Sequence, residues 1–217
     1  MLKNEMDFYE KYILPRASHF ICGSGIIDKQ RRKVVHRARG RVIEIGMGSG
    51  LNLPYYDTSR VEMIWGLEPS AASLVKAKER ARQTSITTEL IRSSGEKIPL
   101  ESNSADTVLI TYTLCTIPDV GQALAEIRSV LRPDGELIFC EHGLAPDEKV
   151  RRWQYRLNPF WSRIGGGCSL TRPIPDLIKQ AGFTIQDIQA RYVMKWKFAA
   201  YHYWGTARPP TADAKKE

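Results

Sequence analysis

The chain has 217 residues, of which 42% are hydrophobic, and its formal net charge is +8. This size supports one well-buried domain rather than two, and the positive charge favours nucleic acid, an anionic lipid surface or an anionic substrate as partner. No apolar run approaches the roughly 18 residues of a membrane helix, so we expect no membrane span. Four cysteines without C-x-x-C spacing indicate reduced thiols, so we expect a cytoplasmic protein.

Two helices are expected before the first strand. Residues 3–20 carry apolar side chains at helical spacing, residues 26–38 form a basic helix, and Gly40 is expected to end it. Charged residues among the first ten positions argue against a signal peptide.

These helices are not needed to build a sheet, so we expect residues 1–40 to form a helical lid over the strand ends, or to pack against the sheet. As a lid they would bring Tyr9, Tyr12 and His19 close to a substrate pocket. Their basic residues also allow weak peripheral contact with an anionic membrane, although a solvated helix face explains them equally simply.

A short apolar strand at residues 42–45 runs into alternating glycines, Gly46, Gly48 and Gly50. Glycines at such a turn permit positive φ and let the backbone approach a ligand closely. The dinucleotide-binding pattern G-x-G-x-x-G opens a helix that receives a pyrophosphate, whereas here Pro54 delays any helix. The loop therefore suits an uncharged or zwitterionic ligand better than a pyrophosphate, and Glu44 beside it would repel phosphate.

A second carboxylate, Glu68, ends the next apolar strand at residues 63–67. A carboxylate at that place can accept hydrogen bonds from both hydroxyls of a ribose. The arrangement E-x-G-x-G-x-G followed by a second acidic residue is typical of the class I methyltransferases that use S-adenosylmethionine (SAM).

The remaining elements alternate between strand and helix, which predicts βαβ units and a parallel sheet. Ser70 is the expected N-cap of the helix after Glu68. Further along, we expect strands at 86–91, 105–110 and 137–140, a helix at 120–131, helices at 147–164 and 174–181, a strand at 183–189 and a last strand at 192–206. The main domain then spans residues 41–206, and the polar residues 207–217 form a disordered tail.

Six short segments carry a clear family resemblance: residues 44–50, 66–70, 111–118, 131–135, 139–143 and 167–172. The chain resembles SAM-dependent methyltransferases of the methyltransferase-11 type. Within that group it resembles the mammalian methyltransferase-like thiol S-methyltransferases and bacterial relatives linked to methylation of hydrogen sulfide and methanethiol.

The resemblance implies a Rossmann-like α/β fold with helices on both faces of a seven-stranded sheet in the order 3-2-1-4-5-7-6. The sheet is mainly parallel with an antiparallel last strand, and SAM lies over the carboxyl ends of the strands. The residues expected to contact SAM are Glu44, Gly46, Met47, Gly48, Gly50, Asn52, Glu68, Pro69, Ser94, Gly95, Glu96, Thr111, Tyr112 and Leu114.

The acceptor side is expected at the ends of the fourth and fifth strands. His142 can take a proton from the acceptor or favour its thiolate, or it can stand behind the reacting groups. Glu141 can orient His142 or pair with Arg172, and Arg172 can attract an anion such as hydrosulfide or form a structural ion pair.

Two cysteines and a threonine complete this set. Cys115 and Cys168 can line a soft pocket or pack as small hydrophobes, and Thr171 is a candidate substrate contact. The set Cys115, Cys140, His142 and Cys168 matches no zinc spacing, so we expect no metal.

These observations favour methyl transfer from SAM to a small thiol. Its products would be S-adenosylhomocysteine and a methyl thioether, methanethiol or dimethyl sulfide. The alternatives are a phospholipid N-methyltransferase, a quinone-type C- or O-methyltransferase and a SAM-binding regulator without turnover. The chain after the fourth strand lacks the Asn/Asp-Pro-Pro-aromatic motif, and no RNA-binding module is appended, so we do not expect a nucleic-acid substrate.

Overall fold

The computed structural model of the protein describes residues 25–210. The helix expected at residues 3–20, with Tyr9, Tyr12 and His19, lies outside the described residues. Within them, no helix combines the length and the apolar character that crossing a membrane requires.

A seven-stranded sheet in the order β3-β2-β1-β4-β5-β7-β6 confirms the predicted topology. Strands β1 to β5 pair in parallel, and β7 pairs antiparallel with both β5 and β6. The strands are β1 (Gly40–Ile45), β2 (Val61–Leu67), β3 (Thr87–Ile91), β4 (Ala105–Thr111), β5 (Leu131–His142), β6 (Thr184–Tyr192) and β7 (Tyr201–Arg208).

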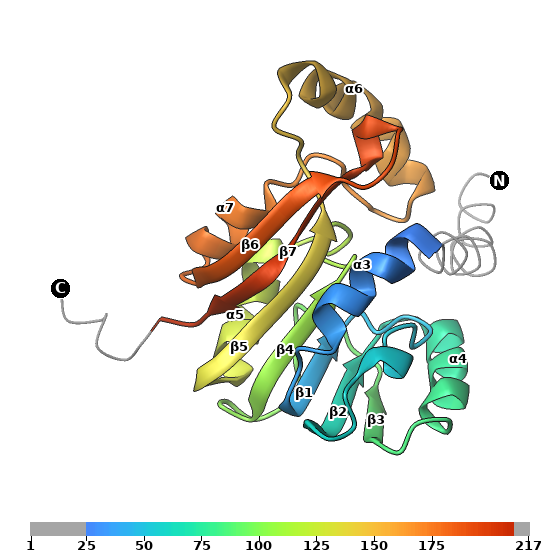
Figure 1. Cartoon of the computed structure of the whole chain (residues 1–217), viewed down its shortest axis with the longest axis vertical. Helices are drawn as coiled ribbons and strands as arrows, with labels where there is room; N and C mark the ends of the chain where they lie inside the picture. Colours follow the sequence, from blue (N-terminus) through green and yellow to red (C-terminus); the bar gives the residue numbers. More distant parts are fainter. Residues whose placement is uncertain (1–24, 211–217) are drawn as a thin grey trace.

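Helices cover both faces of this sheet, with α3 in front of it and α5 and α7 behind it in Figure 1. The α-helices are α3 (Gly25–Val35), α4 (Ala71–Ala81), α5 (Val120–Val130), α6 (Glu148–Ile164) and α7 (Ile174–Gln180). Within residues 25–210 the chain also forms two short 3-10 helices, η2 (Leu53–Tyr55) and η3 (Lys197–Ala199). The side chain of Ser70 accepts a hydrogen bond from the Ser73 amide, which confirms Ser70 as the N-cap of α4.

Side chains on the two faces of β1 pack in two separate hydrophobic cores. Ile43 and Ile45 pack in the core that includes α5 and α7, whereas Val42 packs in the core that includes Val34 of α3 and Ala77 of α4. Successive strand residues point to opposite faces, so one short strand supplies both layers. The central strands are therefore anchored on both sides, and their carboxyl ends form a fixed edge.

Several boundaries differ from the sequence prediction, among them the end of β6, which continues to Tyr192 instead of stopping at 189. Helix α3 ends at Val35, and Gly40, at φ +62°, opens β1 instead of ending the helix. Helix α5 ends at Val130 because β5 begins at once and runs for 12 residues, so Glu141 and His142 lie within the strand.

The last strand begins later than its β-prone composition suggested. Residues 193–200 leave the sheet through η3, and β7 starts at Tyr201. At its other end, β7 continues through Arg208, past the expected start of the tail at 207, because Ala207 is fully buried opposite Leu137 of β5.

The pairing of β6 with β7 depends on one glycine. A Cβ at Gly205 would collide with the backbone carbonyl of Asp187, at the irregular register of β6. Asp187 also accepts two hydrogen bonds from Arg37, at 3.0 Å each, and one from Thr206. Close backbone approach at Gly205 thus lets one carboxylate join β6, β7 and the segment that follows α3.

We predict that Gly205→Ala lowers the free energy of unfolding by about 2 kcal/mol or more, because backbone atoms cannot move aside as a flexible side chain can. Gly121→Ala in α5 is the matched control, since its added methyl would meet only the Asp119 carboxylate, at 3.4 Å. We expect Gly121→Ala to leave stability unchanged or raise it by about 0.5–1 kcal/mol. Urea denaturation measures both variants, and equal stabilities would contradict the prediction.

Candidate active site

The glycine loop follows β1 at the carboxyl edge of the sheet. Gly46, Gly48 and Gly50 all have positive φ, at 67°, 59° and 78°. A Cβ at Gly46 would collide with the side chain of Thr113, whereas a Cβ at Gly48 would meet only the Gly46 carbonyl oxygen, at 3.9 Å. Gly46 therefore packs against the chain beyond β4, and the open side of the loop lies at Gly48.

Glu68 fixes this loop from the end of β2. One carboxylate oxygen accepts a hydrogen bond from the Gly48 amide at 2.9 Å, and the other accepts one from the Ser70 amide at 2.8 Å. Burial raises the pKa of Glu68, and the two amides offset only part of this rise. Glu68 thus ties the loop after β1 to the start of α4, which confirms that the second carboxylate lies beside the glycine loop.

Glu44 lies below the loop in a buried polar network. Its Oε1 accepts from Asn52 Nδ2 at 2.9 Å, and its Oε2 accepts from the Tyr56 hydroxyl at 2.6 Å. Asn52 also donates to the Thr111 hydroxyl at 3.0 Å, and the Arg31 guanidinium donates to both Asn52 and Thr111. All five side chains are buried. The network therefore joins α3, β1, the 50–56 segment and β4 beneath the loop.

Arg31 is a site residue that the sequence did not single out. It belongs to a run of basic residues that, from the sequence alone, is simply explained as a solvated helix face. In the structure, however, Arg31 is buried. Its guanidinium also lies over the Tyr112 ring, 5.3 Å from the ring centroid. Tyr112 has φ +53°, and its hydroxyl is 3.0 Å from Nδ1 of His202, a second residue that the sequence analysis missed.

A separate cluster of soft side chains lies where the chain leaves β4 and β5. His142 Nε2 is 3.1 Å from Cys168 Sγ, and Cys168 Sγ is 3.8 Å from Cys115 Sγ. The indole of Trp161 donates to Cys168 Sγ at 3.4 Å. The structure therefore brings together three residues that the sequence nominated, and adds Trp161 as their partner.

The charges in this cluster favour a thiolate beside an imidazolium. Hydrogen bonds from Cys115 and His142 outweigh burial and lower the pKa of the Cys168 thiol. Burial lowers the pKa of His142, but its hydrogen bond and charge interaction with Cys168 reverse this, so the net shift is upward. Both shifts favour the ionised form of the Cys168 thiol.

Glu141 and Arg172 position this cluster from behind. Glu141 Oε1 accepts from the Thr113 amide at 2.7 Å and from the Leu114 amide at 3.1 Å. Arg172 donates to the Ile117 carbonyl oxygen at 2.6 Å. The ion pair between Glu141 and Arg172 that the sequence allowed does not form, because each side chain binds the backbone of the turn after β4 instead.

Cys140 does not join the cluster. It lies two positions before His142 on β5, so both side chains point to the same face of the sheet, but Cys140 sits further back along the strand, within the core. The Cys140 thiol lies 3.5 Å from the Tyr112 hydroxyl and is fully buried in the core beneath α3.

Residues 43–139 match the methyltransferase domain family. The chain is 31% identical over 175 residues to human thiol S-methyltransferase TMT1B, a match that covers 78% of this chain and 72% of the relative. The chain belongs to the SAM-dependent methyltransferase family. A phosphatidylethanolamine N-methyltransferase of Cereibacter sphaeroides is 29% identical over 127 residues, covering 57% of this chain and 62% of the relative. A methyltransferase structure from Bacillus halodurans superposes with a TM-score of 0.69 at 12% identity, covering 87% of this chain and 100% of that structure.

SAM is therefore the cofactor of this methyltransferase, and the glycine loop fits it. The open side at Gly48 allows close backbone approach, and Glu68 stands beside it. Other residues expected near SAM have structural contacts of their own. Gly95 packs against Ile45, and Glu96 accepts from the Asp119 amide at 2.9 Å.

The remaining expected contacts are of three kinds. Met47 and Leu114 are buried in the cores, with the Met47 sulfur against Gly66. Pro69 and Ser94 accept hydrogen bonds through their carbonyl oxygens, from Arg92 and from Lys97. The hydroxyl of Thr171 pairs with that of Ser169 at 3.2 Å.

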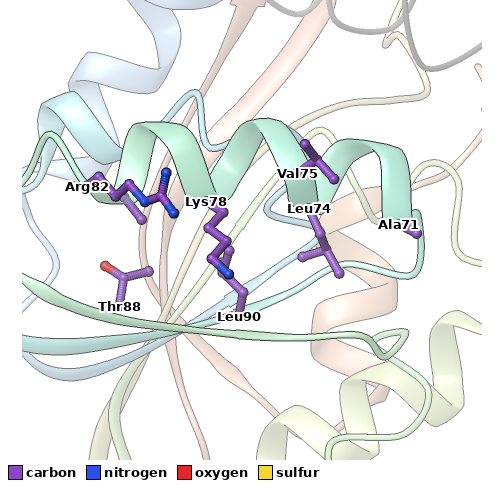
Figure 2. A pocket seen from close by; sticks show the side chains of 8 residues that line it. Ala71, Leu74, Val75, Lys78, Arg82, Thr88 and Leu90 are labelled. Atoms are coloured by element: carbon purple, nitrogen blue, oxygen red, sulfur yellow. The ribbon is translucent and has the colours of Figure 1, made fainter.

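An open groove on this methyltransferase lies away from the site, between α4 and the edge strand β3. Figure 2 shows Leu74, Lys78 and Arg82 of the helix facing Thr88 and Leu90 of the strand. Apolar side chains and the two basic side chains of Lys78 and Arg82 line this groove. None of the residues of the glycine loop or the cysteine cluster lines it.

The buried network makes stability depend on pH. Burial raises the pKa of Glu44 from 4.5 to about 7, opposed by the Tyr56 hydrogen bond and the Arg31 charge. The folded protein thus retains this proton to a higher pH than the unfolded chain does. The contribution of Glu44 to the free energy of unfolding is therefore full below pH 4.5 and is lost as pH rises towards 7.

We predict that Glu44→Gln reduces the loss of unfolding free energy between pH 4.5 and pH 7, by at most roughly 3 kcal/mol. A glutamine keeps both contacts, accepting from Asn52 and donating to the Tyr56 hydroxyl. Urea denaturation at pH 5 and pH 7.5 measures the difference, with the exposed Glu62→Gln as control. A Glu44→Gln profile parallel to that of the wild type would contradict the raised pKa.

Proposed function

We propose that this methyltransferase transfers the methyl group of SAM to the sulfur of a small thiol such as hydrogen sulfide or methanethiol. The observation that carries the proposal is the cluster of Cys115, His142 and Cys168, whose environment lowers a thiol pKa. The relationship to a protein named thiol S-methyltransferase supports the same acceptor class.

Methyl transfer from SAM to sulfur requires little more than a thiolate held in line with the bond between the methyl carbon and the sulfonium sulfur. SAM supplies a methyl group that its positive sulfur activates, so position and the exclusion of water dominate the rate. A thiol reacts as its thiolate, and positive charge at His142 favours that form in an acceptor beside it, as it does in Cys168. The proposed products are S-adenosylhomocysteine and a methyl thioether, methanethiol or dimethyl sulfide.

The donor and acceptor regions are far apart along the chain but meet in the structure through Thr113. Thr113 packs against Gly46 of the glycine loop, and Cys115 lies two residues further on. We therefore place the cofactor on residues 46–50 with its ribose at Glu68, and the acceptor at the cysteine cluster. Ser94, Gly95 and Glu96 are the proposed contacts of the adenine ring.

Two of our expectations extend beyond the chemistry. The contacts of Arg31 tie α3 over the strand ends, which supports residues 1–40 as a lid. Cys140 and Cys168 are free thiols, which suits a reducing compartment such as the cytoplasm.

A phospholipid amine is the second candidate acceptor. Helix α6, beyond the carboxyl end of β5 in Figure 1, exposes the large aromatic side chains of Trp153, Tyr155 and Phe160. Arginines accompany them on the same helix. Aromatic and basic residues together suit the surface of an anionic bilayer, and one relative is named phosphatidylethanolamine N-methyltransferase.

We predict methylated product from sulfide, methanethiol or larger thiols when purified protein is incubated with SAM and analysed by mass spectrometry. His142→Ala is expected to lower turnover about 100-fold while leaving affinity for S-adenosylhomocysteine unchanged by calorimetry. The exposed His36→Ala is the matched control. Product from a phospholipid amine or a quinone, with none from any thiol, would overturn the thiol proposal.

Vesicle sedimentation separates the second candidate from the first. If the acceptor is a phospholipid, the protein sediments with anionic vesicles in a salt-sensitive manner and methylates phosphatidylethanolamine within them. Replacing Trp153 and Phe160 by alanine would then reduce both effects. We expect no methylated phospholipid, and its appearance at a rate comparable to thiol methylation would favour the second candidate.

A further inference from the structure

We propose that Cys115, His142 and Cys168 bind one zinc ion whose fourth coordination position receives the acceptor thiol. This rests on the proposed function for the identity of the acceptor, whereas the ion site itself rests on geometry. The three ligand atoms, two Sγ and one imidazole nitrogen, all lie within 4.8 Å of one another.

Two of the three ligand separations, Cys115 to Cys168 and His142 to Cys168, can be compared with those on a tetrahedral ion, and the third, His142 to Cys115, lies within 4.8 Å. With Zn–S bonds of about 2.3 Å, two thiolates on tetrahedral zinc stand about 3.8 Å apart. The two sulfurs lie 3.8 Å apart in the structure. A zinc-bound nitrogen and sulfur stand about 3.6 Å apart on the same bond lengths, so the imidazole, now 3.1 Å from Cys168, would withdraw by about half an ångström.

The backbone holds the ligands in place before any ion binds. The Ser169 amide donates to the Cys115 carbonyl oxygen at 2.8 Å, which joins the two cysteine-bearing segments at Cys115 itself and at the residue after Cys168. Gly167, at φ +85°, turns the chain into Cys168. His142 is fixed by the pairing of β5 with His202 of β7. Such preorganisation lowers the cost of binding.

The donor set selects the kind of ion. Two thiolates and one imidazole are soft or borderline ligands, which favour zinc over magnesium or calcium. Two thiolates neutralise a divalent cation, so a largely buried site keeps no net charge. The Trp161 indole donates to Cys168 Sγ, as outer hydrogen bonds commonly do around metal ligands. Three protein ligands with one open position is the arrangement of catalytic zinc sites.

The metal would take the place of a positive charge on His142 in activating the acceptor, because an imidazole that binds a metal is neutral. A thiol that binds the fourth position releases its proton to solvent, because metal coordination deprotonates a thiol. Its sulfur then forms a bond to the methyl carbon as the bond from that carbon to the sulfonium sulfur of SAM breaks. The methylated sulfur is a poor ligand and leaves the ion, and zinc changes no oxidation state in the process.

The test uses the full chain, stripped of metal with a chelator and titrated with Co²⁺. We expect one Co²⁺ per chain, an intense thiolate-to-cobalt charge-transfer band, and displacement by one Zn²⁺. Methanethiol added in the absence of SAM is expected to shift that band. Cys115→Ser, Cys168→Ser and His142→Ala are each expected to weaken Co²⁺ binding at least tenfold.

Cys140→Ser is the matched thiol control, because Cys140 lies on the same strand as His142 but contacts Tyr112 instead. We expect it to keep the band, and circular dichroism checks that every variant is folded. A full chain that binds neither ion, or a folded Cys168→Ser that keeps the band, would overturn the zinc site. Thiol methylation at full rate by metal-free protein would overturn its role and leave the proposed function standing. Metal binding without turnover of any thiol would overturn the proposed function and leave the zinc site standing.

Discussion

Buried carboxylates organise the reactive edge of the sheet. Strands β1, β2 and β5 each lead to one: Glu44, Glu68 and Glu141. Each accepts hydrogen bonds from groups on a neighbouring loop, and in Glu68 and Glu141 those groups are backbone amides. A buried carboxylate without donors would be costly, and amides in an irregular loop would lack acceptors. The carboxylates and the loops therefore stabilise one another.

The burial that holds these loops has an electrostatic consequence. It raises the pKa of Glu44 and of Glu141 to about 7, even though both accept hydrogen bonds that favour their charged form. Thr113 links two of these regions. Its amide donates a hydrogen bond to Glu141, and its side chain packs against Gly46. A shift of the turn after β4 would thus disturb the cofactor loop and the cysteine cluster together.

How far the sequence predicted this site depended on the distance between the partners in the chain. The glycine loop, Glu68 and the N-cap at Ser70 are local patterns. The alternation of strands and helices predicted a parallel sheet, and the order of its strands followed from the family resemblance. The network around Asn52 joins Arg31 to Thr111 across 80 positions, and no periodic pattern encodes such a pairing. His202, whose partner Tyr112 lies 90 positions away, went unnoticed for the same reason. The expected absence of a metal rested on spacing along the chain, which has no meaning for ligands from three separate segments.

An ionised Cys168 near the activated methyl group of SAM could itself be methylated, and its contacts within the cluster oppose that reaction. A free thiolate there would compete with the acceptor for the methyl group. Hydrogen bonds from Cys115, His142 and Trp161 converge on that sulfur and lower its pKa. The nucleophilicity of a thiolate falls with its pKa, so a thiolate with a normal pKa attacks faster than Cys168 does. Coordination to an ion would replace the contacts from Cys115 and His142, whose atoms would then bind the ion, and it would occupy a lone pair of Cys168, so the ion would also keep this thiolate from being methylated.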